Sequence, residues 1–415
     1  MAKRFALIGL TLVAGLASTL SFAQSTSVTG SQSTTTTNTI TTAVPFLRIS
    51  PDARSGAMGD VGIAISPDAN AQHWNLSKLP FAAKPYGLSV TYTPWLKDLV
   101  PDIFLAYISG YAKFGQNDNQ ALSASMRYFS LGEINYTDAA GASLGTGKPN
   151  EVALDLGYSR KLSENLSAGL GFRYIHSAIA SGFTVGATTA QYSPGNAFGA
   201  DLGVYYTKTK EIDEYRNSNL SLGAILSNVG SKISYTSTRR DFIPINLGLG
   251  GAYTYQADEY NKITFALDLN KLLVPTPKDT NTDGSSGGLP EFNPYYDKGV
   301  VSGMLGSFGD GDELKEIQAS IGAEYWYQNQ FAVRAGYFYE HKDKGDRKYL
   351  TVGLGVRYQI FNLNFAYLVP SGSGINRNPL SNTLRFSLLF EFNKKDRGAE
   401  ASGSGLNTTP ARTTP

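Results

Sequence analysis

The chain has 415 residues, of which 17% are charged, 41% are hydrophobic and 12% are aromatic. It contains no cysteine, which excludes disulfides, zinc-thiolate sites, iron–sulfur clusters and catalytic thiols. Low charge together with 25 Tyr, 21 Phe and 44 Gly is unusual for a soluble enzyme and is what a sheet with one apolar and one polar face requires.

The N-terminus has the form of a secretory signal. Lys3 and Arg4 precede an apolar stretch over 5–20, and Ser21-Phe22-Ala23 is a small-x-small cleavage site. We therefore expect residues 1–23 to be a signal peptide. Its removal takes away two of the 36 basic residues and no acidic one, so the remaining net charge is zero and nothing favours nucleic acid binding. Residues 24–42 are almost entirely Ser, Thr, Gln and Asn, and we expect them to form a disordered linker.

From residue 86 onward, short segments with alternating hydrophobicity recur between turn residues, and we predict fourteen strands. Most have about ten residues, the length of a tilted strand that crosses a bilayer. The predicted strands are 86–93, 104–114, 120–131, 151–161, 166–175, 197–206, 220–229, 246–256, 262–270, 317–327, 331–340, 348–359, 363–369 and 383–392.

The connections separate a membrane barrel from a soluble sandwich, since only the barrel calls for short turns at one end and long loops at the other. Connections after even strands are mostly short, as at 115–119 and 328–330, and those after odd strands are mostly long, as at 132–150 and 271–316. Residues 207–219 break this rule. The pattern predicts an all-β fold, a fourteen-stranded antiparallel transmembrane barrel over 86–392 in the outer membrane of a Gram-negative bacterium. We expect residues 393–415 to form a disordered periplasmic tail.

Aromatic and charged residues within the strands carry further expectations. Several aromatic residues suit interfacial girdles, with packing inside the barrel as the alternative: Tyr92, Trp95, Tyr107, Tyr174, Tyr205, Tyr206, Trp326 and Tyr339. Recurring arginines should face the lumen or lie near strand ends, because charge on the lipid face is costly. These are Arg127, Arg160, Arg173, Arg334, Arg357 and Arg385, with Asp155, Asp201, Glu324 and Glu391 as their expected partners.

The segment that precedes the strands carries a more specific signal. It reads G-A-x-G-D-x-G from Gly56, then D-A-N-A from Asp68 and W-N-x-x-K-L from Trp74. With fourteen strands behind it, this pattern resembles the FadL-like outer-membrane superfamily and, within it, the PorV (LptO) family, the barrel component of the type IX secretion system. The resemblance covers residues 43–393.

The resemblance implies a function in protein secretion without catalysis. PorV-like proteins associate with the large type IX translocon barrel, receive cargo through its C-terminal signal domain, and deliver it to the sortase complex that attaches cargo at the cell surface. In FadL-like barrels the N-terminal segment lies in the lumen as a hatch, which here would be residues 43–85. The hatch residues that we single out are Gly56, Gly59, Asp60, Asp68, Asn70, Trp74 and Asn75.

The longest connection, 271–316, is the second candidate site, because loops of this length are usually functional or disordered. Its second half is rich in apolar residues: Leu289, Phe292, Tyr295, Tyr296, Val300, Val301, Met304, Leu305 and Phe308. We expect this stretch to contact the translocon or cargo. The alternative is a cap folded over the barrel mouth.

No catalytic or metal site emerges from the remaining residues. Three scattered histidines give no catalytic triad, and the calcium-loop-like stretch that begins at Asp279 has Pro290 where the bidentate Glu should be. We expect no cofactor, no metal and no enzyme activity. The rival interpretation is a FadL-like transporter of hydrophobic small molecules. A water-filled porin is disfavoured by the hatch and the apolar loop. The expected partners are the translocon barrel, the sortase complex, the cargo signal domains and outer-membrane lipid.

Overall fold

The structure is a computed structural model that describes residues 40–95, 102–137, 143–179, 193–236, 239–275, 298–309, 313–369 and 383–393. The chain divides into two compact units, Met1–Thr36 and Thr37–Pro415, and all described residues belong to the second. The expected signal peptide, the linker up to residue 39 and the tail beyond residue 393 lie outside the described residues.

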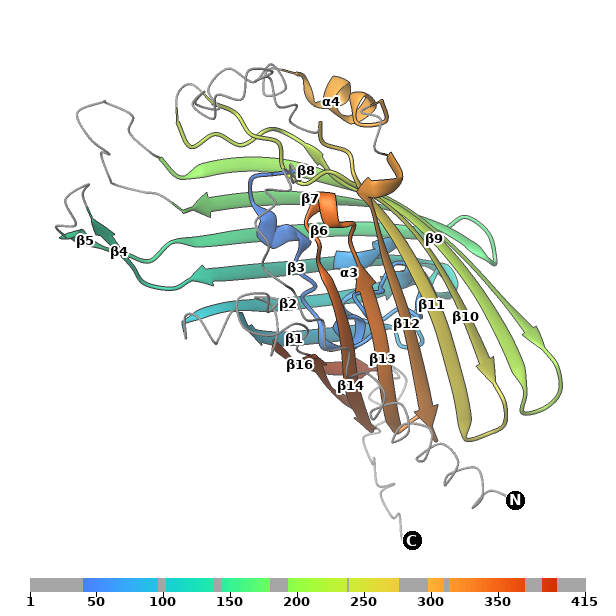
Figure 1. Ribbon diagram of the computed structural model, residues 1–415. Helices are drawn as coiled ribbons and strands as arrows, with labels where there is room; N and C mark the ends of the chain where they lie inside the picture. The colour runs from blue at the N-terminus through green and yellow to red at the C-terminus, as the bar shows by residue number, and fades with distance from the viewer. Residues whose placement is uncertain are drawn as a thin grey trace, which may run out of the picture. The chain divides into compact units, whose positions relative to one another are not determined.

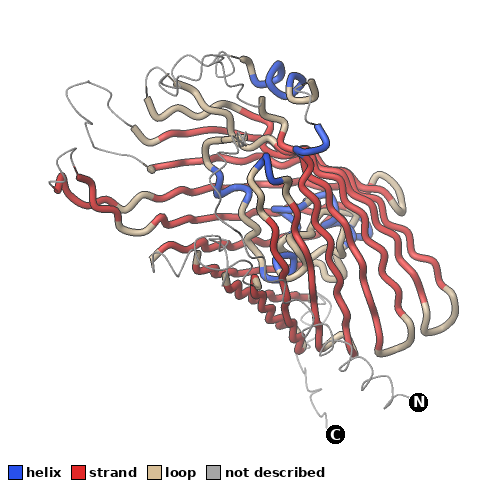
Figure 2. The backbone as a smooth tube through the Cα atoms, viewed as in Figure 1, coloured by secondary structure: helices blue, strands red, loops and turns tan. Residues whose placement is uncertain are grey.

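Fourteen antiparallel strands close into a barrel, which confirms the predicted fold class (Figures 1 and 2). Each strand pairs with its neighbour along the barrel, and the last strand closes the ring by pairing with the first, with Tyr86 opposite Phe392. The barrel strands are β1 (Tyr86–Pro94), β2 (Ile103–Phe114), β3 (Gln120–Leu131), β6 (Asn150–Lys161), β7 (Leu166–Ala178), β8 (Gly195–Glu211), β9 (Asn217–Gly230), β10 (Asn246–Gln256), β11 (Asn261–Leu272), β12 (Ile317–Tyr327), β13 (Phe331–Tyr339), β14 (Lys348–Tyr358), β15 (Phe361–Leu368) and β16 (Leu384–Phe392). The loop after β3 contains a hairpin that the sequence pattern did not predict, formed by β4 (Ile134–Thr137) and β5 (Ser143–Gly147).

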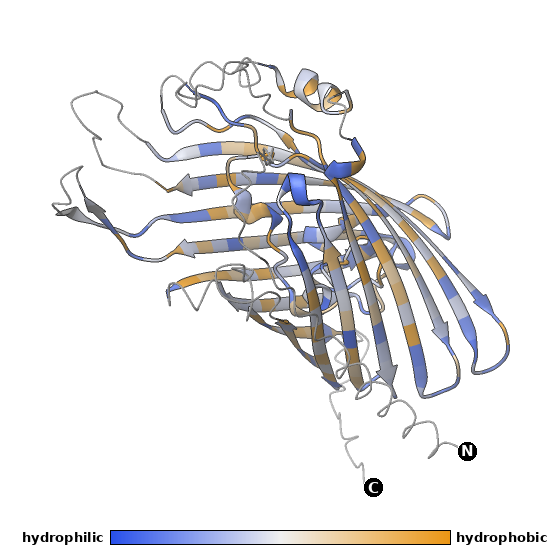
Figure 3. Cartoon of the chain, viewed as in Figure 1, coloured by the Kyte–Doolittle hydropathy of each residue, from blue (hydrophilic) through white to orange (hydrophobic). Residues whose placement is uncertain are grey.

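The strands alternate between an exposed apolar face and a buried face that is mostly polar (Figure 3). On β14, Leu350, Val352 and Leu354 are 44–56% exposed, whereas Thr351 between them is 1% exposed. A closed sheet that turns its apolar side chains outward cannot be a soluble sandwich, whose apolar face would be inside. The chain is therefore an outer-membrane barrel.

The connections at one end of the barrel are all short, and this corrects one prediction. The connection 207–219 was expected to be long, but β8 and β9 continue to Glu211 and Asn217, which leaves a short turn at 212–216. By the usual rule for outer-membrane barrels, this end with the short turns faces the periplasm.

Five of the aromatic residues considered for the interfacial girdles are informative. Tyr92 and Tyr339 are exposed on the outer face, as expected for a girdle. Tyr107, Tyr205 and Trp326 instead face inward and are at most 4% exposed, so the girdle expectation was wrong for these three and the packing alternative holds. Successive side chains of a strand point to opposite faces, and each of these three residues alternates with the lipid-facing residues of its strand, so it faces the lumen.

The hatch, residues 43–85, lies against the inner face of the barrel and contains only short helices (Figure 1). These are η1 (Pro45–Arg48), α2 (Ala53–Gly56), α3 (Ala71–Trp74) and η2 (Leu76–Phe81), while η3 (Gln116–Asp118), α4 (Val300–Gly306), η5 (Glu313–Glu316) and η6 (Lys342–Lys344) lie in connections. Helices of four residues are too short to be stable alone, so packing against the wall must hold this segment in shape. None of the helices in the described ranges is both long and apolar enough to cross a membrane.

Candidate functional site

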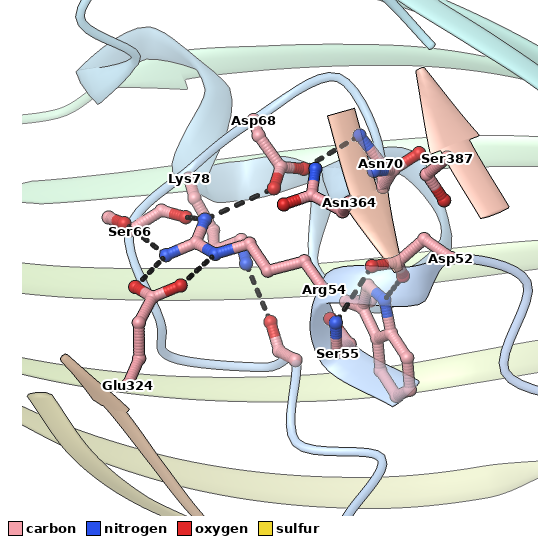
Figure 4. A network of polar contacts seen from close by, with 12 residues as sticks. Asp52, Arg54, Ser55, Ser66, Asp68, Asn70, Lys78, Glu324, Asn364 and Ser387 are labelled. Carbon is pink, nitrogen blue, oxygen red and sulfur yellow. Dashed lines mark hydrogen bonds and ion pairs between the residues drawn. The ribbon is translucent and has the colours of Figure 1, made fainter. Parts of the chain in front are cut away.

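The hatch is fastened to the barrel wall by a buried ion-pair network centred on Arg54 (Figure 4). Its guanidinium donates Nε to Oε2 of Glu324 at 2.9 Å and Nη2 to Oε1 at 2.8 Å, a bidentate pair. Arg334 donates to the same carboxylate at 2.7 Å. The remaining Arg54 donors reach the carbonyl of Ser66 at 2.9 Å and the carboxylate of Asp68 at 3.1 Å. Arg54 thus joins two parts of the hatch to strand β12.

A second fastening lies on β11, where Asp268 accepts the backbone N–H groups of Gly62 and Ile63 at 2.7 and 2.8 Å. The carbonyl of Gly62 in turn accepts a hydrogen bond of 2.6 Å from the Lys78 ammonium. These contacts satisfy backbone N–H and C=O groups of a segment that belongs to no sheet. Such pairing is required because an irregular segment is buried here.

The predicted hatch residues take up specific contacts inside the barrel. Asp52 caps α2 by accepting from Ser55 N and also accepts from Trp74 Nε1 at 2.7 Å. Asp60 accepts a hydrogen bond of 2.6 Å from the Tyr349 hydroxyl and one of 3.2 Å from Arg385.

Asn70 and Asn75 take different roles within the hatch. The Asn70 N–H donates to Asp68 at 2.8 Å, so this residue closes a turn within the hatch. Asn75 reaches across and donates to the carbonyl of Val204 on β8 at 3.0 Å.

Two glycines of the motif permit the close approach of hatch and wall. Gly59 has φ +70°, and a Cβ built on it would lie 2.6 Å from the backbone nitrogen of Tyr337. A Cβ on Gly62 would lie 2.0 Å from the ring of Trp74. A side chain at either position would push the hatch off the barrel wall or displace the Trp74 ring.

Burial and neighbouring charges shift the pKa of three hatch side chains. It lowers the pKa of Lys78 to about 8, and it lowers the pKa of His73 well below its ordinary value, with Arg127 adding to the effect. Burial alone would also lower the pKa of Arg54, but Glu324 and Asp68 outweigh it and raise that pKa. Arg54 is therefore a permanent cation, while His73 is neutral at physiological pH.

Three of the six predicted arginines, Arg173, Arg334 and Arg357, pair with predicted carboxylates, and the other three differ, Arg385 by pairing with Asp60 of the hatch. Arg173 contacts Asp155 at 2.5 Å and Asp201 at 3.0 Å, and Arg334 contacts Glu324. Arg127 instead donates to the hatch carbonyl of Leu47 at 2.9 Å and contacts His73 Nδ1 at 2.5 Å. Arg160 faces outward near the end of its strand.

A cavity of about 110 Å³ remains between the hatch and the wall. Its lining mixes the hatch residues Arg48, Asp60, His73 and Trp74 with amide and hydroxyl groups of the wall strands. Sequence analysis gave no sign of this cavity, because its lining comes from many separate strands.

At the end of the barrel with the long loops, helix α4 divides its apolar residues between two faces. Val300 and Met304 pack against the core cluster beneath, and Gly303 approaches the ring of Phe242. The opposite face presents Val301 and Leu305, which are 66% and 70% exposed, and Phe308 in the turn after the helix is 50% exposed, with the Lys271 ammonium 5.6 Å from its ring centroid. We call these three residues the α4 patch.

The base of this loop is held by charges that sequence analysis did not single out. Lys271 contacts Glu313 at 2.8 Å and also Glu316, while Lys344 contacts Glu316 at 2.9 Å. These pairs fix η5 to β11 and η6, so α4 is tethered on its C-terminal side. The other predicted loop residues, Leu289, Phe292, Tyr295 and Tyr296, lie outside the described residues.

In the part of the chain that the structure describes, no three His, Asp or Glu side chains converge as they would around a metal ion.

A family profile described as type IX secretion system protein PorV matches residues 32–279. No curated protein matches the chain.

Several solved outer-membrane structures are distantly similar. The Ralstonia pickettii toluene transporter TbuX is 12% identical, with 82% of this chain and 98% of that chain covered and a TM-score of 0.45. The Pseudomonas putida toluene transporter TodX is 10% identical, with coverage of 83% and 99% and a TM-score of 0.46. A Pseudomonas aeruginosa FadL homologue is 10% identical, with coverage of 83% and 99% and a TM-score of 0.40. Likeness at this level carries no functional argument.

Proposed function

We propose that this chain, which belongs to the PorV family of type IX secretion system proteins, is the non-catalytic barrel that binds the C-terminal signal domain of secreted cargo at the translocon and carries it to the surface sortase complex. Family membership makes it a component of type IX secretion. The cargo-binding and shuttling steps are the proposal. The observation that supports them best is the α4 patch.

The α4 patch has the properties of a partner surface. It exposes two large apolar side chains on a helix whose other face is already packed, and a third, Phe308, in the turn directly after that helix. Leu314, in η5 nearby in sequence, is 85% exposed as well. Covering one such side chain contributes about 1.5–3 kcal/mol, so a partner gains substantially by docking here. The two alternatives for this loop are therefore compatible, with one face of α4 capping the barrel and the other free for a partner.

The fastened hatch favours this function over transport of hydrophobic small molecules. The hatch is held by ion pairs and backbone hydrogen bonds to β11 and β12. The cavity beside it is small and is lined by polar as well as apolar groups, including Arg48 and Asp60. At about 110 Å³ it is well below the roughly 300–1,000 Å³ of typical small-molecule sites.

The test is the substitution Leu305→Asp in a strain that carries the variant as its only copy. The substitution removes a leucine that a bound partner would cover and introduces a charge in its place. It should weaken the affinity for the partner roughly 10- to 100-fold. We expect surface-attached cargo to fall by at least tenfold while the amount of folded barrel stays unchanged. Fractionation and immunoblotting of both cargo and barrel measure this.

Ile212→Asp is the matched control, because Ile212 is 47% exposed in the turn at the opposite end of the barrel. It should leave cargo display within twofold of wild type. Equal cargo display by the Leu305 variant and the control would refute the partner role of the α4 patch.

A further inference from the structure

The outer wall of the barrel carries an apolar groove that has no part in the function proposed above. It has a volume of about 660 Å³ and runs over β1, β2, β3 and β6. One row of paired residues explains it, since Leu88, Gly110, Ala124 and Leu156 lie side by side across the four strands. The two small residues form a floor between two leucines, and Ile108, Leu122 and Met126 complete the walls.

Aromatic residues place this groove within the hydrocarbon layer. Towards the long loops, Tyr92, Phe104 and Tyr128 form an outward-facing ladder with ring centroids 5.5 and 5.9 Å apart. Towards the short turns, Phe114 and Tyr158 pair at 6.4 Å. Such rings lie at the headgroup level on both sides of a membrane. The groove between them is therefore in contact with acyl chains.

A cation lies beyond the periplasmic end of the groove, past Tyr158 of the aromatic girdle. Arg160 follows Leu156 by four residues on the same outward face of β6 and pairs in register with Gln120. That separation is about 13 Å along the strand, or about 10 Å along the membrane normal for a tilted strand. The apolar band of such a barrel is about 25 Å tall, so this separation fits within the roughly 12 Å that belongs to one leaflet. Within the described residues, no hydrogen bond or ion pair engages the Arg160 side chain.

We propose that this groove binds one phospholipid of the periplasmic leaflet, with an acyl chain over Gly110 and Ala124 and the phosphate on Arg160. An exposed guanidinium beside an aromatic girdle complements a phosphate in charge and geometry. The short turns place this end in the periplasmic leaflet, where the lipid is phospholipid.

The experiment is native mass spectrometry of the full barrel in detergent, titrated with palmitoyl-oleoyl phosphatidylethanolamine. Ala124→Leu fills the floor of the groove, and Arg160→Gln removes the phosphate partner. Ala335→Leu is the matched control, because Ala335 is an exposed alanine on the outer face of β13. Heat-modifiable migration on gels verifies that each variant is folded. Ala112→Leu, also in the groove lining, replaces any groove variant that fails this check.

We expect the wild type and the Ala335 variant to retain one phospholipid with affinities within twofold of each other. Filling the groove should weaken retention at least tenfold, and loss of Arg160 at least threefold. Equal retention by the Ala124 and Ala335 variants would overturn the site, since it would then be annular lipid. Unchanged affinity in the Arg160 variant, or selective retention of lipopolysaccharide instead, would overturn the assignment to a periplasmic-leaflet phospholipid.

Discussion

Glu324→Gln is the perturbation that tests most sharply how the hatch is held. The carboxylate accepts three charged hydrogen bonds, two from Arg54 and one from Arg334, at 2.7–2.9 Å, and its side chain is 2% exposed. Neutralising it leaves two guanidiniums close together without their shared counterion. Breaking a buried pair in this way costs roughly 3–5 kcal/mol. The backbone hydrogen bonds between the barrel strands do not involve this side chain. The lost free energy should therefore weaken the docking of the hatch and leave the barrel intact.

The assay uses the absence of cysteine in the chain. Ser55, which is 2% exposed at the start of the hatch, is replaced by Cys as a near-isosteric reporter, and its labelling by a maleimide reports opening of the hatch. A cost of 3–5 kcal/mol raises the open fraction, and with it the labelling rate, between about 100- and 5,000-fold. Double substitution with Arg54→Gln should recover part of the effect, because it removes the repulsion between the Arg54 and Arg334 guanidiniums.

Glu391→Gln is the control, since Glu391 is a lumen carboxylate that pairs loosely with Arg357 of the wall at 3.9 Å. It should change the labelling rate less than threefold. If Glu324→Gln also labels within threefold of wild type, the ion pair does not hold the hatch and the energetic reasoning is wrong.

Two further predictions use the same reporter. Gly59→Ala should destabilise the closed hatch by roughly 2–4 kcal/mol, because the residue has φ +70° and its new Cβ would meet the Tyr337 backbone. Gly251→Ala, where the nearest atom is 3.6 Å away, should leave the labelling rate unchanged, and equal labelling of both variants would contradict the packing argument. His73 has a lowered pKa in the closed hatch, so below about pH 6.5 the open state binds a proton that the closed state does not. The free energy that favours the closed hatch should therefore decrease as the pH is lowered, by at most about 1.4 kcal/mol per pH unit. His73→Gln should remove that part of the pH dependence, and an unchanged pH profile would refute it.

The sequence predicted the barrel well because period-two alternation and connection length are local properties. The strands β3, β10 and β12 begin and end where the pattern placed them. The excess length of 207–219 was misjudged because Lys208 and Lys210 lie beyond the membrane, where strands continue without an apolar face. The β4–β5 hairpin was missed for the same reason.

The candidate site was only partly accessible to sequence reasoning. The motif identified the hatch, but not that Arg54 would meet Glu324, which lies 270 residues away in sequence. Asp268 and Lys78 gave no signal either, because a lone charged residue looks the same whether it is solvated or buried against a backbone group. The apolar run in the long loop could be recognised in the sequence. Which of its residues pack against the barrel and which are exposed depends on how helix α4 is oriented, and only the structure shows this.

The most direct test of the central claim is a mild-detergent pull-down of the barrel from native outer membranes, followed by mass spectrometry, with wild type and Leu305→Asp compared side by side. The secretion account predicts that wild type brings down a very large translocon barrel, sortase components or cargo with a shared C-terminal domain, and that the variant loses at least one of them. Recovery of the wild-type barrel alone with a bound apolar small molecule would contradict the account and favour a transporter.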